Sequence, residues 1–486
     1  MSKSRRAGLL AAVCSVGLLA GLFSAPAHAE TLADAIALAY QTNPTLQGQR
    51  ASQRALDESV VQARGGLRPS ISLSGDASWS DREVTDGDAN TPTSRSSGAG
   101  LSVSQPLYTG GRVSSGISAA RADVLTGREG LRGVEAQVLQ TVITAYVDVR
   151  RDQERLRIAT DNVAVLQRQL DEARARFEVG EITRTDVAQA EARFAGARAS
   201  FSSAQAQLAI SRASYAAVVG QNPGDLAPEP SLEGLLPTTV DEAFVAAEEA
   251  NPQVLAAEYG ERASAARLAA TRAERRPTVS ASGGIGYNSP GFGGQFENYS
   301  DSVSGSVTVR MPIFTGGLIN SSVRAATERN RADQLGIEEA RRTALRTVSQ
   351  AWNSLVGARA NLIANEEQVR ATRIAFEGVR QEAQVGLRTT LDVLNAEQEL
   401  RNAELAMINA RRDEYVASAI LLAAMGKLEA RYLTPDVPIY DPVLNATRVN
   451  ASWGWVPWEP VLEVVDRVGG PEISSPPADA PVATAK

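Results

Sequence analysis

The sequence PLYTGG at residues 106–111 begins a stretch that runs without proline to VG at 179–180 and DV at 186–187. Its apolar residues recur at alternating steps of three and four. The clearest run is Leu156, Ala159, Val163, Leu166, Leu170, Ala173 and Phe177. This spacing is typical of a heptad seam on an α-helix and not of a strand. At 1.5 Å per residue the helix would be roughly 100 Å long, which is typical of coiled coils, spanning structures and repeats.

The same pattern is written a second time. PIFTGG stands at 312–317, VG at 385–386 and DV at 392–393. Each landmark lies 206 positions after its first copy, from 106 to 312 at the start and from 186 to 392 at the end. The two copies therefore have the same length without a gap, and the sequence predicts an internally duplicated, mainly helical fold.

A return helix follows each long helix. Its seam in the first copy is Val187, Ala190, Phe194, Ala197, Phe201, Ala204 and Leu208. We therefore predict a long helix over 111–179 with a return helix over 186–219, and their repeats over 317–385 and 392–425. Residues 221–239 form a proline-rich linker between the halves.

A β-hairpin precedes each long helix. After Arg68-Pro69 the apolar period changes from helical to two, with one small or polar face. The first apolar face holds Ile71, Leu73, Gly75, Ala77 and Trp79. The sequence predicts hairpins over 69–106 and 277–312, with strands of about ten residues, which suffice to span a bilayer core. A water-soluble hairpin packed on the helices is the alternative.

A shorter helix opens each half, from about Thr31 to Gly65 and from Val240 to Arg275. Asn43-Pro44 and Asn251-Pro252 fall inside these segments and should bend or break them. The repeat offset is 208 here (43 to 251) and 206 after the hairpins. The length difference between the halves therefore lies in the hairpin region, and we place it at the hairpin tip.

The two ends of the chain differ from the repeats. A basic start, an apolar run and Ala-His-Ala predict a signal peptide over 1–29, cleaved between Ala29 and Glu30. The repeats then occupy 30–220 and 240–426. Residues 427–468 look irregular, and the Gly, Pro, Ser and Ala content of 469–486 predicts a disordered tail.

Signal removal also limits the chemistry, because it takes away the only cysteine, Cys14, and the only histidine, His28. A chain without either residue has no His-based triad, thiol nucleophile or ordinary zinc site, so we predict no enzyme, metal or cofactor. The signal carries three basic residues and no acidic one, so the net charge moves from −7 to −10. An acidic chain is a poor partner for nucleic acid.

Two hairpins supply four strands, and four strands cannot close a barrel. Open sheet edges are not tolerated in lipid, so several chains would have to share one barrel. Two chains would give eight strands and a filled interior, whereas three would give twelve strands and room for a lumen. The long helices would then hang side by side from the barrel as a hollow duct.

The chain resembles the TolC family of outer-membrane efflux and type I secretion channels. The resemblance covers about residues 31 to 430 and rests on three motifs that occur once in each half. They are Asn-Pro, the PLYTGG or PIFTGG sequence after the hairpin, and the Val-Gly…Asp-Val turn. It implies a homotrimer, with a transmembrane 12-stranded β-barrel in the outer membrane lipid of a Gram-negative cell and an α-helical barrel in the periplasm. It also implies an equatorial belt, to which 221–239 and 427–468 would contribute.

The resemblance further implies a tripartite export system. The duct would carry secreted proteins or drugs from an inner-membrane ABC or proton-driven transporter. A periplasmic adaptor, or membrane fusion protein, would dock at the turns, on Val179, Gly180, Val385 and Gly386.

The same turns would hold a periplasmic gate. By position in the motif, the resemblance assigns the constriction to Asp186, Arg388 and Asp392, with Asn395 at a second ring position that is often acidic in the family. The family's tyrosine before the second Val-Gly is Ala383 here, so fewer bonds would hold the gate. Helix N-capping is an alternative role for Asp186 and Asp392, because each stands where a return helix starts.

Two other classes of protein stay open from the sequence. A periplasmic adaptor also carries a long helical hairpin, but it needs lipoyl-like and barrel domains and not two equal halves. A coiled-coil structural stalk would need no matched hairpins. Nothing in the sequence separates protein cargo from small toxic molecules.

Overall fold

The computed structural model describes residues 29–81, 94–291, 300–435, 437–450 and 454–470. The predicted signal peptide up to residue 28, both hairpin tips and most of the predicted tail lie outside these residues. The expected length difference at the hairpin tips therefore stays a prediction.

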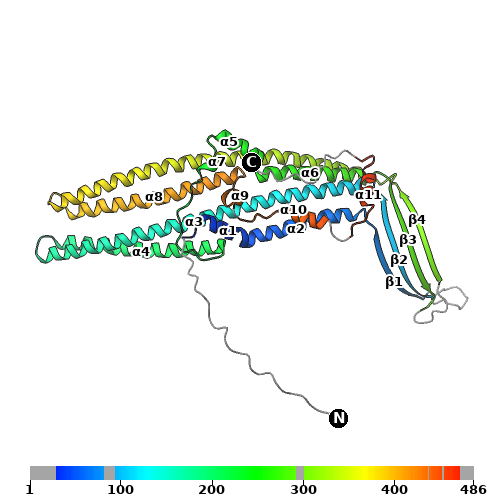
Figure 1. The fold of residues 1–486 in the computed structure, drawn as a ribbon, viewed down its shortest axis with the longest axis horizontal. Helices are drawn as coiled ribbons and strands as arrows, with labels where there is room; N and C mark the ends of the chain where they lie inside the picture. The colour runs from blue at the N-terminus through cyan, green and yellow to red at the C-terminus, as the bar shows by residue number, and fades with distance from the viewer. Residues whose placement is uncertain (1–28, 82–93, 292–299, 436, 451–453, 471–486) are drawn as a thin grey trace, which may run out of the picture.

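The molecule is a long bundle of helices with one sheet at its right-hand end (Figure 1).

Where the structure describes it, the first half contains four helices and two strands. They are α1 (Leu32–Thr42), α2 (Pro44–Gly65), β1 (Ser70–Ser80), β2 (Ser94–Tyr108), α3 (Arg112–Glu178) and α4 (Arg184–Val219). A linker with the short 3₁₀ helix η1 (Glu233–Leu235) follows. The second half repeats the order with α5 (Val240–Ala250), α6 (Pro252–Ala273), β3 (Thr278–Ser289), β4 (Ser300–Arg310), α7 (Leu318–Gln384) and α8 (Thr390–Ala424). The predicted fold class, long helices in duplicate with four strands, is confirmed.

The Asn-Pro dipeptides break the short helices as the sequence predicts. Asn43 is extended, ends α1 and caps α2, because its Oδ1 accepts hydrogen bonds from the Thr45 and Leu46 amides. Its Nδ2 donates to the Val218 carbonyl at 2.9 Å, at the end of α4. Asn251 repeats this contact with the Ala424 carbonyl at 2.8 Å. Each Asn-Pro thus ties the start of its half to the end of its return helix.

The four strands form one antiparallel sheet in the order β1-β2-β3-β4. Its register aligns rows of like residues across all strands. One row is Leu73, Leu101, Ile285 and Val303, and the adjacent row is Ser72, Ser102, Gly284 and Ser304. Successive side chains of a strand point to opposite faces, so one face is apolar and the other carries serine and glycine.

The largest core lies at mid-length, where α1, α5 and the linker pack against the long helices. Tyr146 and Tyr215, both fully buried, are among its largest side chains. Glu30 is held there, because its amide donates to the Asp225 carbonyl at 2.9 Å and its Oε1 accepts from the Tyr215 hydroxyl at 2.6 Å. Ala29 is exposed beside it, so the predicted mature start would sit at this core.

The segment after α8 is not irregular, and that expectation is wrong. It contains α9 (Ala430–Leu433), α10 (Pro442–Asn450) and α11 (Glu459–Arg467). α9 contacts α1 at mid-length, whereas α10 runs along α2 and α11 contacts α3 and β2 at the sheet end, and the expected equatorial belt stays a prediction. The segment therefore runs along the bundle from mid-length to the sheet.

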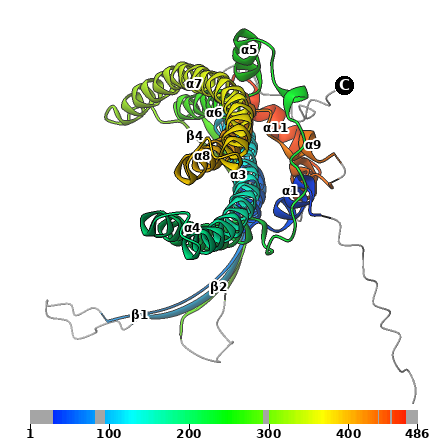
Figure 2. The ribbon, with the colours of Figure 1, turned by 90° about the vertical axis from the view of Figure 1, so that its left-hand side faces the viewer.

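Seen along its length, the bundle is a curved wall (Figure 2). The long helices α3, α4 and α7 form the arc, and α1, α9 and α11 lie on its convex side. Among the described residues, no helix combines the length and the apolar character needed to cross a membrane.

Candidate functional site: the two helix turns

The two turns that join the long helices to the return helices have the same backbone design. Gly180, two residues after the end of α3, has the left-handed conformation (φ 80°), and Gly386 follows α7 in the same way (φ 81°). The next amide donates back to the last helical turn in both, from Glu181 to the Arg176 carbonyl and from Leu387 to the Glu382 carbonyl, each at 2.9 Å. This is the Schellman arrangement, and it explains why the motif needs glycine.

Both return helices begin with a capping box. Thr183 caps α4, and its amide and hydroxyl donate to Asp186 Oδ2 at 2.9 and 2.7 Å. Thr389 makes the same two bonds to Asp392, at 3.0 and 2.8 Å. The threonines are therefore the N-caps, and the aspartates expected as caps stand three residues later. Hydrogen bonds from the threonine lower the pKa of both aspartates, and the charge of Arg388 lowers that of Asp392 further.

The side chains of the two turns differ at one matched position. Ile182 packs into a small apolar cluster with Leu170, Ala173 and Ala190. The residue 206 positions later is Arg388, which points to the surface and pairs with Glu382 at 2.8 Å. About half of each side chain of that pair is exposed (50% and 47%). An exposed pair of this kind contributes little to stability.

Further from the turns, α8 packs against α3 and α4. Arg193 on α4 donates to Asn395 Oδ1 at 2.9 Å, and Gln169 on α3 donates to Glu397 Oε2 at 2.7 Å. An apolar contact of Leu166, Ala197 and Leu394 lies beside them. These contacts join the second helical hairpin to the first near the turn end.

Glu397 is the buried charge in this contact, with 2% of its surface exposed. Its second oxygen, Oε1, has no hydrogen-bond partner in the described part of the chain, and the Arg401 guanidinium lies 3.9 Å away. Burial raises the pKa of Glu397, whereas the bond from Gln169 and the charges of Arg401 and Arg168 act in the opposite direction. A carboxylate held this way costs free energy that protonation would relieve.

The structure places the predicted gate residues at one end of the molecule but not in one network. Asp186 and Asp392 bond within their own turns, and Asn395 alone reaches the other hairpin. Within the described part of one chain, no hydrogen bond or ion pair joins Arg388 to either aspartate.

Sequence reasoning missed four residues of this region. They are Arg193, Gln169, Glu397 and Glu382. One signal could have found Glu397, because it stands between Leu394 and Leu400 at steps of three on an otherwise apolar seam. The partners of the other three cannot be read from spacing along one helix.

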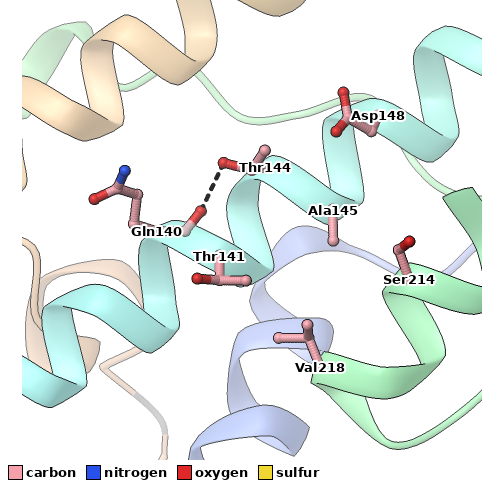
Figure 3. A pocket seen from close by; sticks show the side chains of 7 residues that line it. All are labelled: Gln140, Thr141, Thr144, Ala145, Asp148, Ser214 and Val218. Atoms are coloured by element: carbon pink, nitrogen blue, oxygen red, sulfur yellow. Dashed lines mark hydrogen bonds between the residues drawn. The ribbon is translucent and has the colours of Figure 1, made fainter.

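A shallow hollow of about 250 Å³ lies at mid-length between α3 and α4 (Figure 3). Gln140, Thr141 and Thr144 line it from α3, and Ser214 and Val218 from α4. Its one charged side chain is Asp148, which already pairs with Arg412 at 2.8 Å and Arg151 at 3.0 Å. Among the described residues, no His, Cys, Asp and Glu cluster could hold a metal ion. The turn end is therefore the stronger candidate site.

Comparisons with known proteins identify the family of the chain. The profile of the family described as "Outer membrane efflux protein" matches residues 35–221 and 244–427, the two repeats. The chain is 33% identical over 444 residues to the outer membrane efflux protein BepC of Brucella suis biovar 1, which covers 91% of this chain and 95% of that protein. It is 28% identical over 419 residues to the outer membrane protein TolC of Vibrio cholerae, with 84% and 93% covered.

The fold also has solved counterparts. The crystal structure of the Campylobacter jejuni CmeC outer membrane channel superposes with a TM-score of 0.73. The superposition covers 86% of this chain and 89% of that one, at 14% sequence identity. At this level of identity the likeness concerns the fold.

Proposed function

Because the chain belongs to the outer membrane efflux protein family, we propose that copies of it form the exit duct of a tripartite export system. The family predicted from the repeated motifs is thereby confirmed, and its described members are outer membrane channels and not enzymes. The duct would cross the periplasm and the outer membrane, and it would receive its cargo from an inner-membrane transporter through a periplasmic adaptor.

The exposed sheet is the observation that carries this proposal. Leu73 is 80% exposed and Val303 82%, at the two ends of the apolar row. A large apolar face in contact with water is unfavourable, whereas lipid would cover it at no such cost. The opposite face, with its serines and glycines, suits the inside of a water-filled barrel.

The sheet also needs other chains. β1 and β4 each pair on one side only, so the sheet has two open edges within the described residues. Unpaired backbone groups are not tolerated in lipid, and joining β4 of one copy to β1 of the next would satisfy them. Three copies would give the predicted twelve strands, enough for a lumen.

The long helices support the same assembly. α7 leaves apolar residues exposed along its length, among them Leu335 (72%), Val356 (51%), Ile363 (60%) and Ile374 (67%). The first three are separated by whole heptads, so they lie on one stripe. We propose that this stripe packs against a neighbouring copy and completes an α-helical barrel below the sheet.

The turn end would be the periplasmic tip, with the gate and the adaptor site. We propose that Arg388, Asp186 and Asp392 bond between copies in the closed tip, with Asn395 beside them. Side chains at an exposed tip can exchange such partners at modest cost. Val179 and Val385 are 72% and 71% exposed beside Gly180 and Gly386, so they are available to an adaptor.

A planar-bilayer recording of the purified chain from Glu30 tests the proposal. We expect a small, steady single-channel conductance, because a closed tip limits flow through a formed barrel. Cross-linking in detergent should give a species of three chains. A protein with a strong helical signal but no channel and no trimer would contradict the duct and favour a periplasmic stalk or adaptor.

A further inference from the structure

The helix α11 is amphipathic, but its orientation is the reverse of that expected in water. Its inward face holds Glu459, Leu462, Glu463 and Asp466. Its outward face is a stripe of valines at steps of three and four. They are Val461 (62% exposed), Val464 (65%) and Val465 (41%), and Val468 (66%) extends the stripe at the residue after the helix. A surface helix normally turns its apolar stripe to the core.

The inward face is fixed by the hydrogen bonds that its buried carboxylates accept and by an ion pair. Asp466 accepts hydrogen bonds from the Thr109 amide at 2.6 Å and the Ser114 amide at 3.1 Å, at the start of α3. Glu459 pairs with Arg68 at 2.9 Å, just before β1. Both acids are nearly fully buried (0% and 4%). The orientation of α11 is therefore built into the junction between the sheet and the long helices.

The neighbours of α11 show which side of the sheet it faces. Trp458, the residue before it, donates to Gln105 Oε1 at 3.3 Å. Gln105 is two and four residues after Val103 and Leu101 on β2, so the three side chains share the apolar face. α11 also lies on the convex side of the curved wall (Figure 2). It therefore continues the apolar face of the sheet at its helix end.

We propose that the valine stripe of α11, with Trp455 and Trp458, lies in the interfacial layer of a phospholipid membrane. This inference rests on the proposed function, which puts the sheet in lipid. The two tryptophans are 56% and 48% exposed, and indole rings favour the boundary between acyl chains and headgroups. An amphipathic helix in that layer buries its apolar face roughly 5–10 Å into it. The helix would fix the depth of the barrel in the membrane.

The experiment uses single cysteines, because the only native one, Cys14, lies in the predicted signal peptide. Val464→Cys reports on α11, and Leu73→Cys (80% exposed) reports on the sheet. Val245→Cys on α5 is the matched control, an exposed valine (55%) far from the sheet. Each variant is labelled with an environment-sensitive fluorophore and reconstituted in phosphatidylethanolamine–phosphatidylglycerol vesicles. Quenching by a headgroup-proximal nitroxide lipid is compared with quenching by iodide.

We expect the ratio of lipid to iodide quenching at Val464→Cys to exceed that at Val245→Cys several-fold, with Leu73→Cys also quenched by lipid. Iodide quenching at Val464→Cys with lipid quenching at Leu73→Cys would overturn the inference and leave the duct in place. No lipid quenching at Leu73→Cys would overturn the duct itself. Protection of Val464→Cys from both quenchers would mean a protein cover. A variant ending at Gly470 would then separate the chain's own tail from a second copy.

Discussion

The turn between α3 and α4 and the turn between α7 and α8 share a backbone but not the side chains that hold them. Both use a left-handed glycine and a capping box, with matched bonds in each. The first adds an apolar contact through Ile182, whereas the second adds an exposed ion pair from Arg388 to Glu382. The apolar contact stabilises its turn more than the exposed ion pair does, because salt and water screen an ion pair at the surface.

The difference extends along the two hairpins. α3 buries residues over most of its length, whereas α7 buries few within one chain, chiefly from Ala344 to Leu355 near mid-length. The second hairpin is held to the first through α8, and near the tip this contact includes the unfavourable buried charge of Glu397. Within one chain, the α7–α8 hairpin is therefore the less tightly held of the two.

Block by trivalent cations gives the largest expected effect. A ring of Asp392 carboxylates from several copies would bind such cations and stop the current, so Asp392→Ala should abolish the block. Asp186→Ala is the matched control, because it removes the same capping bonds from the other return helix. Both variants should raise conductance by loosening the tip. Block that persists in Asp392→Ala would place the cation site elsewhere.

Substitutions of the two left-handed glycines test whether the backbone conformation is equally important in both turns. Gly180→Ala and Gly386→Ala place a Cβ in the left-handed region, which costs about 1–2 kcal/mol. Local opening should rise about tenfold, measured as faster amide hydrogen exchange in the changed turn of the assembled protein. Gly196→Ala inside α4 is the control and should slow exchange slightly, because nothing lies within 4 Å of the added Cβ. A large effect at only one turn would break the backbone equivalence.

Two substitutions of Arg388 separate an ionic gate from a stiff hairpin. Arg388→Ser should raise conductance if bonds between copies hold the tip shut. Arg388→Ile gives the second turn the residue that the first turn has at the matched position, Ile182. Apolar neighbours are available to it, because Phe376 and Val379 occupy the positions that match Leu170 and Ala173 of the Ile182 cluster. Arg388→Ile should raise conductance too, while slowing amide exchange in its own turn. Lower conductance in Arg388→Ile would show that hairpin stiffness, and not ionic bonding, closes the tip.

The fold of the two repeats could be predicted from the sequence because it depends on local rules. Heptad spacing, Asn-Pro breaks and glycines at the turns each act within one or two helical turns, and the repeat doubled every signal. The C-terminal segment could not be predicted in the same way. Its short helices are held by contacts between residues far apart in the sequence, such as Asp466 with Thr109, which lie 357 positions apart.

The position of the candidate site residues could be predicted from the sequence, but their hydrogen-bond and ion-pair partners could not. Position in the motif put Asp186, Arg388 and Asp392 at one end. Their partners depend on helix rotation, which spacing does not fix to within one side chain. Arg388 bonds with Glu382, six residues before it across a turn, and no helical or strand period relates these two positions.

The smallest expected effect concerns Glu397, and it tests why the second hairpin is the looser one. Since burial raises its pKa, its protonated form favours the contact of α8 with α3. That stabilisation is present below the ordinary glutamate range and is lost as pH rises through the raised value. The contact should therefore tighten in acid, seen as slower amide exchange around Leu394 and a lower conductance.

Glu397→Gln should remove this pH dependence and keep the contact tight at neutral pH, because a neutral amide avoids the cost of burying a charge. The matched residue of the first half, Glu191, is exposed and pairs with Arg174 at 2.8 Å. Glu191→Gln should therefore leave both exchange and conductance unchanged. If Glu397→Gln loosened the contact at every pH, the bond from Gln169 to the ionised carboxylate would outweigh burial. The looseness of the second hairpin would then have to come from its exposed turn alone.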